Sequence, residues 1–249
     1  MTLHPSAERG FDSAADAYER ARPGYPSEAV AWLCGRLGLT PRSTVVDLAA
    51  GTGKLTRMLL RTGARVIAVE PVDGMRAKLA DALPSVEALP GVAENLPLPD
   101  RSADAITVAQ AFHWFATDEA LAEMARVLRP RGALGLIWNL REQRDPLQRA
   151  ITELIRPLQG DEPTTYDGRW RTVLERSPLF GPLDEACFRN EQELDANGLA
   201  ERIASISFVA AAREEERSTV VERARALAGD RIVRLPYVTA ALVYRSLRD

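Results

Sequence analysis

Residues 44–55 read Thr-Val-Val-Asp-Leu-Ala-Ala-Gly-Thr-Gly-Lys-Leu. The apolar start of this stretch is typical of a short buried strand. The small residues after Leu48 predict a tight turn, because glycine adopts backbone angles that other residues avoid and lets a ligand approach closely. Amide N–H groups at the start of the following helix would point at such a ligand. The stretch predicts a strand, a ligand-binding turn and a helix, although a turn without a ligand fits the same residues.

Helices and strands alternate around this turn. A helix capped by Ser27 precedes it, and a helix that ends at Gly63 follows it. The further elements expected are a strand at 65–70, a helix with Asp73 as its candidate cap, a weak strand at 86–89, a strand at 104–109, a helix capped by Thr117 and a strand at 133–138. This alternation predicts a doubly wound α/β fold with a mostly parallel sheet.

The pattern changes after Asn139. Residues 140–180 contain several prolines and little strand character, and we expect them to form a helical lid. Strands are expected again at 183–194 and 232–247, with two apolar helix faces between them. Pro236 favours the beginning or the edge of the last strand. We expect one domain over residues 1–249, with residues 1–30 as an amino-terminal elaboration.

Composition narrows the classes of function. Of the 249 residues, 46% are hydrophobic and 27% are charged, which is typical of a globular protein with a buried core. The 32 basic and 35 acidic residues are interspersed, so a basic footprint for nucleic acid is not expected. No apolar run approaches the roughly 20 residues that span a bilayer, and the first residues lack a secretion-signal pattern. We expect a cytoplasmic protein that binds neither nucleic acid nor membranes.

Metal-binding residues are scarce. Cys34, Cys187, His4 and His113 are the only cysteines and histidines, too few for a zinc cluster or an iron–sulfur site. We therefore expect no metal centre built from them, while a magnesium ion held by carboxylates stays open. The chemistry is expected to come from a small organic cofactor or from carboxylates.

Glu70 ends the second predicted strand, next to the glycine turn. In open α/β sheets, ligands bind outside the carboxyl ends of the strands. A carboxylate at this position can accept hydrogen bonds from both hydroxyls of a ribose, and Pro71, Val72 and Met75 offer apolar surface to an adenine. Turn and acid together predict a nucleoside ligand, against the alternative of a solvated glutamate at a strand end.

Two common nucleotide fingerprints are missing. The G-x-G-x-x-G pattern of nicotinamide dehydrogenases needs a third glycine for close contact between helix and strand, and Thr56 stands in that place. The G-x-x-x-x-G-K-[ST] phosphate loop is absent as well.

These residues resemble the class I S-adenosylmethionine-dependent methyltransferases that act on small molecules, over roughly residues 10–140. The family's acid followed by G-x-G-x-G is similar to Asp47 through Gly53, with Ala49 in place of the first glycine. The resemblance implies a Rossmann-like, seven-stranded sheet with an antiparallel terminal strand, and S-adenosylmethionine as cofactor. It also implies that Glu70 holds the ribose. Because Val92 stands where the family often has aspartate, recognition of the adenine amino group falls to Glu94 or to backbone atoms.

Further cofactor contacts follow from the same resemblance. The stretch from Gln110 to Phe115 is similar to the part of the family that faces the transferable methyl group. An amino-terminal stretch that includes Tyr18 and Arg22 resembles a segment that closes over the cofactor in one subgroup. Arg22 would pair with the methionine carboxylate unless it forms a surface salt bridge, and Tyr18 would cover the site. The full expected set is Tyr18, Arg22, Asp47, Ala49, Gly51, Thr52, Gly53, Glu70, Pro71, Met75, Ala93, Glu94 and Gln110.

Methyl transfer depends chiefly on positioning. A neutral thioether leaves, so no acid is needed, and near-attack geometry alone can lower a barrier by about 7–11 kcal/mol. His113 is the candidate catalytic base, because histidine titrates near neutrality and this one follows the fourth predicted strand. The alternative is that His113 packs among its aromatic neighbours.

The acceptor is expected to be a small molecule. Six of the lid arginines suit an acidic acceptor if one or two turn inward, whereas Trp138 and Trp170 suit an aromatic one. The arginines are Arg141, Arg144, Arg149, Arg156, Arg169 and Arg171. A noncatalytic protein that binds S-adenosylmethionine and a nicotinamide-dependent oxidoreductase are the alternative functions, and the chain is expected to be a monomer or a homodimer.

Overall fold

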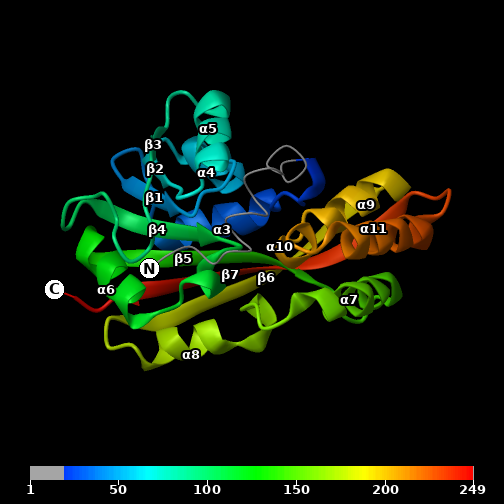
Figure 1. Cartoon of the computed structure of the whole chain (residues 1–249). Helices are drawn as coiled ribbons and strands as arrows, with labels where there is room; N and C mark the ends of the chain where they lie inside the picture. The colour runs from blue at the N-terminus through cyan, green and yellow to red at the C-terminus, as the bar shows by residue number, and fades with distance from the viewer. Residues whose placement is uncertain (1–19, 249) are drawn as a thin grey trace.

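The computed structural model describes residues 20–248. Their strands form one seven-stranded sheet in the order β3-β2-β1-β4-β5-β7-β6. The strands from β1 to β5 pair in parallel, and β7 (Val233–Ser246) pairs antiparallel with both of its neighbours. The expected α/β fold with a mostly parallel sheet and an antiparallel terminal strand is confirmed (Figure 1).

The first half follows the predicted alternation closely. Its elements are α3 (Ser27–Leu37), β1 (Thr44–Leu48), α4 (Lys54–Leu59), η1 (Leu60–Thr62), β2 (Arg65–Val69), α5 (Asp73–Ala82), β3 (Glu87–Leu89), β4 (Ala103–Ala109), η2 (Phe112–Trp114), α6 (Asp118–Val127) and β5 (Leu128–Arg141). Thr117 caps α6 by accepting a hydrogen bond from the Ala120 amide at 3.1 Å, as expected. Ser27 and Asp73 are instead the first residues of their helices, after Pro26 and Val72.

The second half combines two long strands with helices. Its elements are α7 (Pro146–Gln159), η3 (Thr165–Asp167), α8 (Arg169–Arg176), β6 (Phe180–Leu194), α9 (Ala196–Ala204), α10 (Ser207–Ala210), α11 (Glu214–Ala228) and β7. Pro236 lies near the start of β7, one residue before the pairing with β5 begins at Tyr237. The missing N–H of proline therefore costs that ladder no hydrogen bond.

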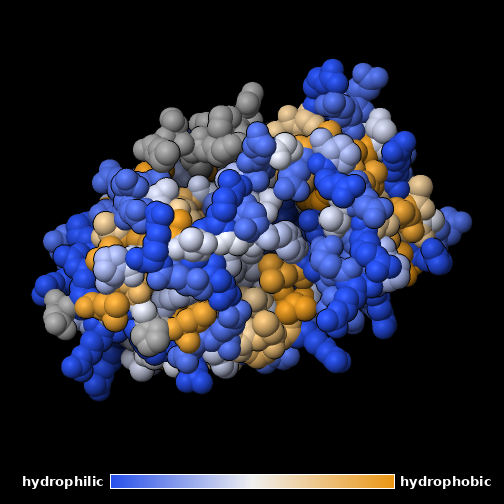
Figure 2. Space-filling view, turned by 90° about the horizontal axis from the view of Figure 1, so that it is seen from below, coloured by the Kyte–Doolittle hydropathy of each residue, from blue (hydrophilic) through white to orange (hydrophobic). Residues whose placement is uncertain are grey.

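Apolar cores lie on both faces of the sheet. Leu33, Leu55 and Val66 belong to the core on one face, and Leu121 and Trp170 to the core on the other. A further apolar cluster joins α7, α9, α10 and α11 around the start of β7, and α7 packs against α10 and α11 within it. On the face shown in Figure 2, hydrophobic side chains form small separate groups within a mostly hydrophilic surface.

The expected lid divides into two parts. Helix α8 packs against the sheet through Trp170 and Leu174, whereas α7 joins the helical cluster through Ile151 and Ile155. The segment between these helices borders the pocket described below, together with Leu140, Arg141 and Gln159. Whether residues 140–180 act as a lid stays a prediction.

The turn after β1 depends on left-handed backbone angles. Ala49, Gly51 and Gly53 have φ angles of 54°, 58° and 86°. A Cβ atom added at Gly53 would lie 3.1 Å from Leu79 Cγ and Leu83 Cδ1. Gly53 is therefore needed both for its backbone angle and for the close approach of α5.

Asp47 anchors the same turn from inside the protein. Its carboxylate is fully buried and accepts hydrogen bonds from the hydroxyls of Thr56, at 2.6 Å, and Thr107, at 3.0 Å. These contacts tie β1 to α4 and to β4. Burial raises the pKa of Asp47 to about 6, although the two threonine hydrogen bonds oppose the rise.

Replacement of Gly53 by alanine is expected to destabilise the fold. The left-handed backbone costs an L-residue about 1–2 kcal/mol, and crowding against α5 adds roughly 1 kcal/mol or more. Gly38→Ala is the matched control, because Gly38 has a φ of 70° and its added Cβ would meet nothing within 4 Å. Urea unfolding should show the larger loss for Gly53→Ala, and equal losses would contradict the proposed crowding.

The buried carboxyl group of Asp47 predicts an unusual pH dependence of stability. Between its unfolded pKa near 3.9 and its folded pKa of about 6, the folded protein keeps a proton that the unfolded chain releases. The stabilisation is complete below about pH 4 and is lost as the pH rises through about 6.

Asp47→Asn removes this titration. From pH 4 to 7 the variant should therefore gain up to about 3 kcal/mol of unfolding free energy relative to the wild type, measured by urea unfolding at each pH. The exposed Asp81, changed to asparagine, provides the control. If the unfolding free energy of the wild type changes with pH in parallel with that of Asp47→Asn, the raised pKa of Asp47 is excluded.

Candidate functional site

The candidate site lies at the carboxyl ends of β1 and β4, where the strand order reverses. The chain leaves β1 for β2 and β3 on one side and returns to β4 on the other, so β1 and β4 are neighbours whose connections diverge. Ligands of open α/β sheets bind at such switch points. The glycine turn follows β1, Glu70 follows β2 and Gln110 follows β4, so three predicted site segments meet at this edge.

Glu70 is joined directly to the glycine turn. One carboxylate oxygen accepts a hydrogen bond from the Gly51 amide at 2.8 Å, and the other accepts one from the Val72 amide at 2.9 Å. Burial raises the pKa of Glu70, while these two amides and the Arg76 guanidinium lower it. A carboxylate offers about four acceptor sites, so Glu70 retains capacity for the two hydroxyls of a ribose.

Apolar residues border the acid and the turn. Met75 is buried, and its sulfur lies 3.8 Å from the position of a Cβ atom added at Gly51. Pro71 is half-buried beside Glu70, and Ala93 is buried. Glu94 is partly exposed in a turn closed by the bridge between Val92 and Asn95. The acid and its apolar neighbours together suit an adenosine, which needs an acid for its ribose and apolar contact for its base.

The predicted residues of the turn take different parts. Thr52 is buried, and Ala49 occupies the left-handed position that the family fills with glycine. Asp47 lies beneath the turn, with both carboxylate oxygens bound to threonine hydroxyls. A direct contact between Asp47 and a cofactor stays a prediction, whereas its support of the turn is visible in the structure.

His113 lies in a pocket beyond β4. Gln110 turns the chain after β4 with a φ of 61°. Phe112 then anchors η2 in the core, edge-on to Phe115 and Trp170. The Nδ1 atom of His113 lies 3.3 Å from the Thr165 hydroxyl. Burial lowers the pKa of His113 to about 4; Asp167 raises it and Arg22 lowers it further. His113 is therefore neutral near pH 7.

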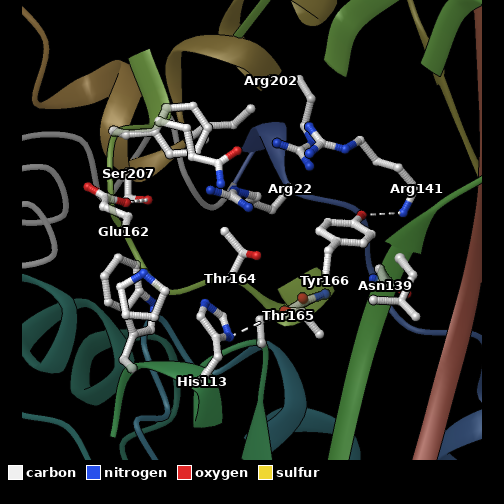
Figure 3. Close-up of a pocket in the computed structure, with 17 residues that line it drawn as sticks. Arg22, His113, Asn139, Arg141, Glu162, Thr164, Thr165, Tyr166, Arg202 and Ser207 are labelled. Carbon is white, nitrogen blue, oxygen red and sulfur yellow. Dashed lines mark hydrogen bonds between the residues drawn. The ribbon is translucent and has the colours of Figure 1, made fainter. Parts of the chain in front are cut away.

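The pocket has a volume of about 140 Å³ and is built by several distant segments. Gln110, His113 and Trp114 line it from the end of β4. Further walls come from the end of β5, from residues 162–166 and from α9 and α10 (Figure 3). The complete lining is Arg22, Gln110, His113, Trp114, Asn139, Leu140, Arg141, Gln159, Glu162, Pro163, Thr164, Thr165, Tyr166, Arg202, Ile206, Ser207 and Phe208.

Backbone contacts hold Arg22 at this pocket. The Arg22 carbonyl accepts a hydrogen bond from Lys54 Nζ at 3.2 Å, and the carbonyl of Gly24 accepts from the side chains of Asn139 and Asn190. The Arg22 guanidinium donates to the Ser205 carbonyl at 2.7 Å and extends into the pocket (Figure 3). Its expected pairing with a cofactor carboxylate stays a prediction. Tyr18 lies outside the described residues.

The two tryptophans do not line the pocket, and their expected role as its walls is wrong. Trp138 and Trp170 are buried in the core with ring centroids 4.4 Å apart. Of the lid arginines, Arg141 lines the pocket. Arg169 and Arg171 pair with Asp167 and Glu185, and Arg144, Arg149 and Arg156 are exposed.

Helix α9 contributes a pocket residue that was not predicted from the sequence. Arg202 lines the pocket and is 7% exposed, about 90 residues along the chain from His113. A signal was present, because Arg202 stands within the apolar helix face of Leu199, Ile203 and Ile206. A charged residue on such a face is seldom fully buried without a partner or a ligand.

Two features are absent from residues 20–248. No helix in this range is long and apolar enough to cross a membrane. No group of three or more His, Cys, Asp or Glu side chains in it gathers as a metal site.

Comparisons with known proteins agree with this geometry. A family model described as a methyltransferase domain matches residues 46–136. An uncharacterized methyltransferase of Mycobacterium tuberculosis is 40% identical over 243 residues, which cover 93% of each chain. A methyltransferase-like protein of Schizosaccharomyces pombe is 34% identical over 204 residues, covering 82% of this chain and 79% of the relative.

A solved structure from Anaeromyxobacter dehalogenans, described as a type II methyltransferase, has a TM-score of 0.68 and 26% identity, and covers 90% of this chain and 97% of that chain. The matched family region holds the glycine turn, Glu70 and His113, and the relatives extend the match through the second half. The chain therefore belongs to the class I S-adenosylmethionine-dependent methyltransferase family and is a methyltransferase.

Proposed function

We propose that this methyltransferase transfers the methyl group of S-adenosylmethionine to a small-molecule acceptor bound beside His113. The observation that carries the proposal is the hydrogen bond between the Gly51 amide and the Glu70 carboxylate, which joins the glycine turn to the acid at the switch point. A ribose held by Glu70 would place the rest of the cofactor along the turn, toward the pocket after β4.

The residues present fit the cofactor. Glu70 would accept from the ribose hydroxyls, Pro71, Met75 and Ala93 would contact the adenine, and the small residues from Ala49 to Gly53 would leave room for the methionine part. Arg22 would pair with its carboxylate. When bound, S-adenosylmethionine supplies a methyl group on a sulfonium, which moves in line to the acceptor as a neutral thioether leaves.

The acceptor would occupy the pocket of about 140 Å³, a size for a small molecule or for one part of a larger one. We propose that neutral His113 accepts a hydrogen bond from the acceptor and can take up its proton. Because the pKa of His113 is about 4, it is a weak base, so orientation of the acceptor would contribute more to the rate than proton transfer. Location in the cytoplasm and the oligomeric state stay predictions.

Calorimetric titration tests the cofactor. S-adenosylmethionine and S-adenosylhomocysteine should bind saturably, whereas NAD should not bind. Glu70→Ala should lower the affinity for both S-adenosylmethionine and S-adenosylhomocysteine by at least about tenfold, as expected for the loss of hydrogen bonds to a charged acceptor. The exposed Glu87 on β3, changed to alanine, is the control, and thermal unfolding checks that each variant is folded. Binding of NAD alone, or unchanged affinity in Glu70→Ala, would refute the proposed site.

His113 can be tested by two independent measurements. The chain has two histidines, so few imidazole resonances appear in an NMR titration. The resonance that is missing from His113→Asn belongs to His113. The resonance of His113 should titrate near pH 4. With an acceptor found by screening, His113→Asn should lower turnover by about 10²-fold or more if His113 accepts the proton. Near-normal turnover across the pH range would leave His113 a packing role.

A further inference from the structure

We propose that the acceptor carries a carboxylate, which Arg202 and Arg141 bind at the end of the pocket formed by β5 and α9. This inference rests on the proposed function and names the chemical class of its acceptor. It arises from two guanidinium groups that face the same cavity from separate parts of the chain.

The first of the two guanidinium groups belongs to Arg202. Arg202 is 7% exposed, and its Nη1 atom is buried without a hydrogen-bond partner among residues 20–248. It also forms no ion pair within that range, although it stands on the apolar face of α9. A buried guanidinium with an unused donor is unfavourable unless an anion or water meets it. Since Arg202 lines the cavity, the cavity is where that partner would be.

Tyr237 fixes the direction of Arg202. The Tyr237 hydroxyl accepts a hydrogen bond from Arg202 Nε at 3.3 Å, and Tyr237 itself is buried on β7. With Nε held in this way, the guanidinium is fixed beside the pocket that Arg202 lines. A side chain held before its ligand arrives loses less conformational freedom on binding.

The second guanidinium group belongs to Arg141. Arg141 is the last residue of β5 and pairs with Tyr237 in the β5–β7 ladder, so the sheet places the two arginines around one tyrosine. Its guanidinium carbon lies 5.5 Å from the centre of the Tyr166 ring, whose hydroxyl accepts from the Arg141 amide at 2.8 Å. Its Nε atom is buried without a partner among the described residues. Figure 3 shows Arg141 and Arg202 on the same side of the pocket.

The charge of the pocket lining favours an anion. With Arg22 assigned to the cofactor carboxylate, two arginines and one glutamate remain in its lining, and the glutamate, Glu162, accepts a hydrogen bond from the Ser207 hydroxyl. The remaining polar lining, including Thr164 and Thr165, is uncharged. Planar guanidinium groups match the two oxygens of a carboxylate, and the small cavity suits one such group at the end of an acceptor. His113 and Gln110, at the end of β4, would then face its reacting part.

The test measures whether the pocket selects carboxylates. Acetate, succinate, benzoate and phenylacetate are each compared with the corresponding amide, and inorganic phosphate and sulfate are included. Binding to the full chain is followed by calorimetry or ligand-observed NMR, with and without S-adenosylhomocysteine. At least one carboxylate should bind at least tenfold more tightly than its amide and more tightly than phosphate or sulfate.

Variants assign that preference to Arg202. Arg202→Gln should weaken the selected carboxylate at least tenfold, and Arg202→Lys should give an intermediate affinity, because an ammonium keeps the charge but lacks the planar donor pair. Arg189→Gln, at an exposed arginine of β6, is the matched control and should bind as the wild type does. Thermal unfolding verifies that each variant is folded.

The inference is overturned if no carboxylate binds more tightly than its amide, if phosphate or sulfate is preferred, or if folded Arg202→Gln binds like the wild type. Failure of the proposed function has a different signature, namely no binding of S-adenosylmethionine or S-adenosylhomocysteine. Because the carboxylate titrations are also run without S-adenosylhomocysteine, the two failures are distinguishable.

Discussion

The hydrogen bond from the Gly51 amide to the Glu70 carboxylate joins the glycine turn after β1 to the acid after β2. The candidate site depends on both. This hydrogen bond requires a backbone N–H at a turn where φ is 58° and an acid at the end of the neighbouring strand. Burial of Glu70 disfavours its charged form, and the amides of Gly51 and Val72 compensate for the lost water. The acid is thus held in place before any ligand arrives.

Close packing beneath the glycine turn limits which residues the turn can contain. Gly53 admits α5 because it lacks a Cβ atom, and Asp47 ties the turn to Thr56 and Thr107. These contacts make the turn part of the core rather than a surface loop. A cofactor-binding turn gains from such rigidity, because a site that is already formed spends less binding energy on ordering itself.

Beyond β4, the pocket combines segments inside the region matched by the family model with segments outside it. The glycine turn, Glu70 and His113 lie within the region matched by the methyltransferase family, whereas Arg202 and Ser207 come from helices inserted between β6 and β7. The helices after β5 and after β6 pack against each other and form the wall opposite His113. Part of the pocket is therefore built by segments that the family model does not cover.

The sequence by itself determined the alternation of strands and helices, the glycine turn, the acid after β2 and the strands of the second half, because short-range periodicity and turn chemistry specify such features locally. It did not determine that Trp138 and Trp170 stack in the core or that Arg202 reaches the pocket. The first contact depends on how α8 packs against the sheet, and the second on how β7 pairs between β5 and β6, which brings Arg141 and Tyr237 together and places α9 beside them. Long-range pairing has no local signature, so only the tertiary structure assigns these side chains to a site or to the core.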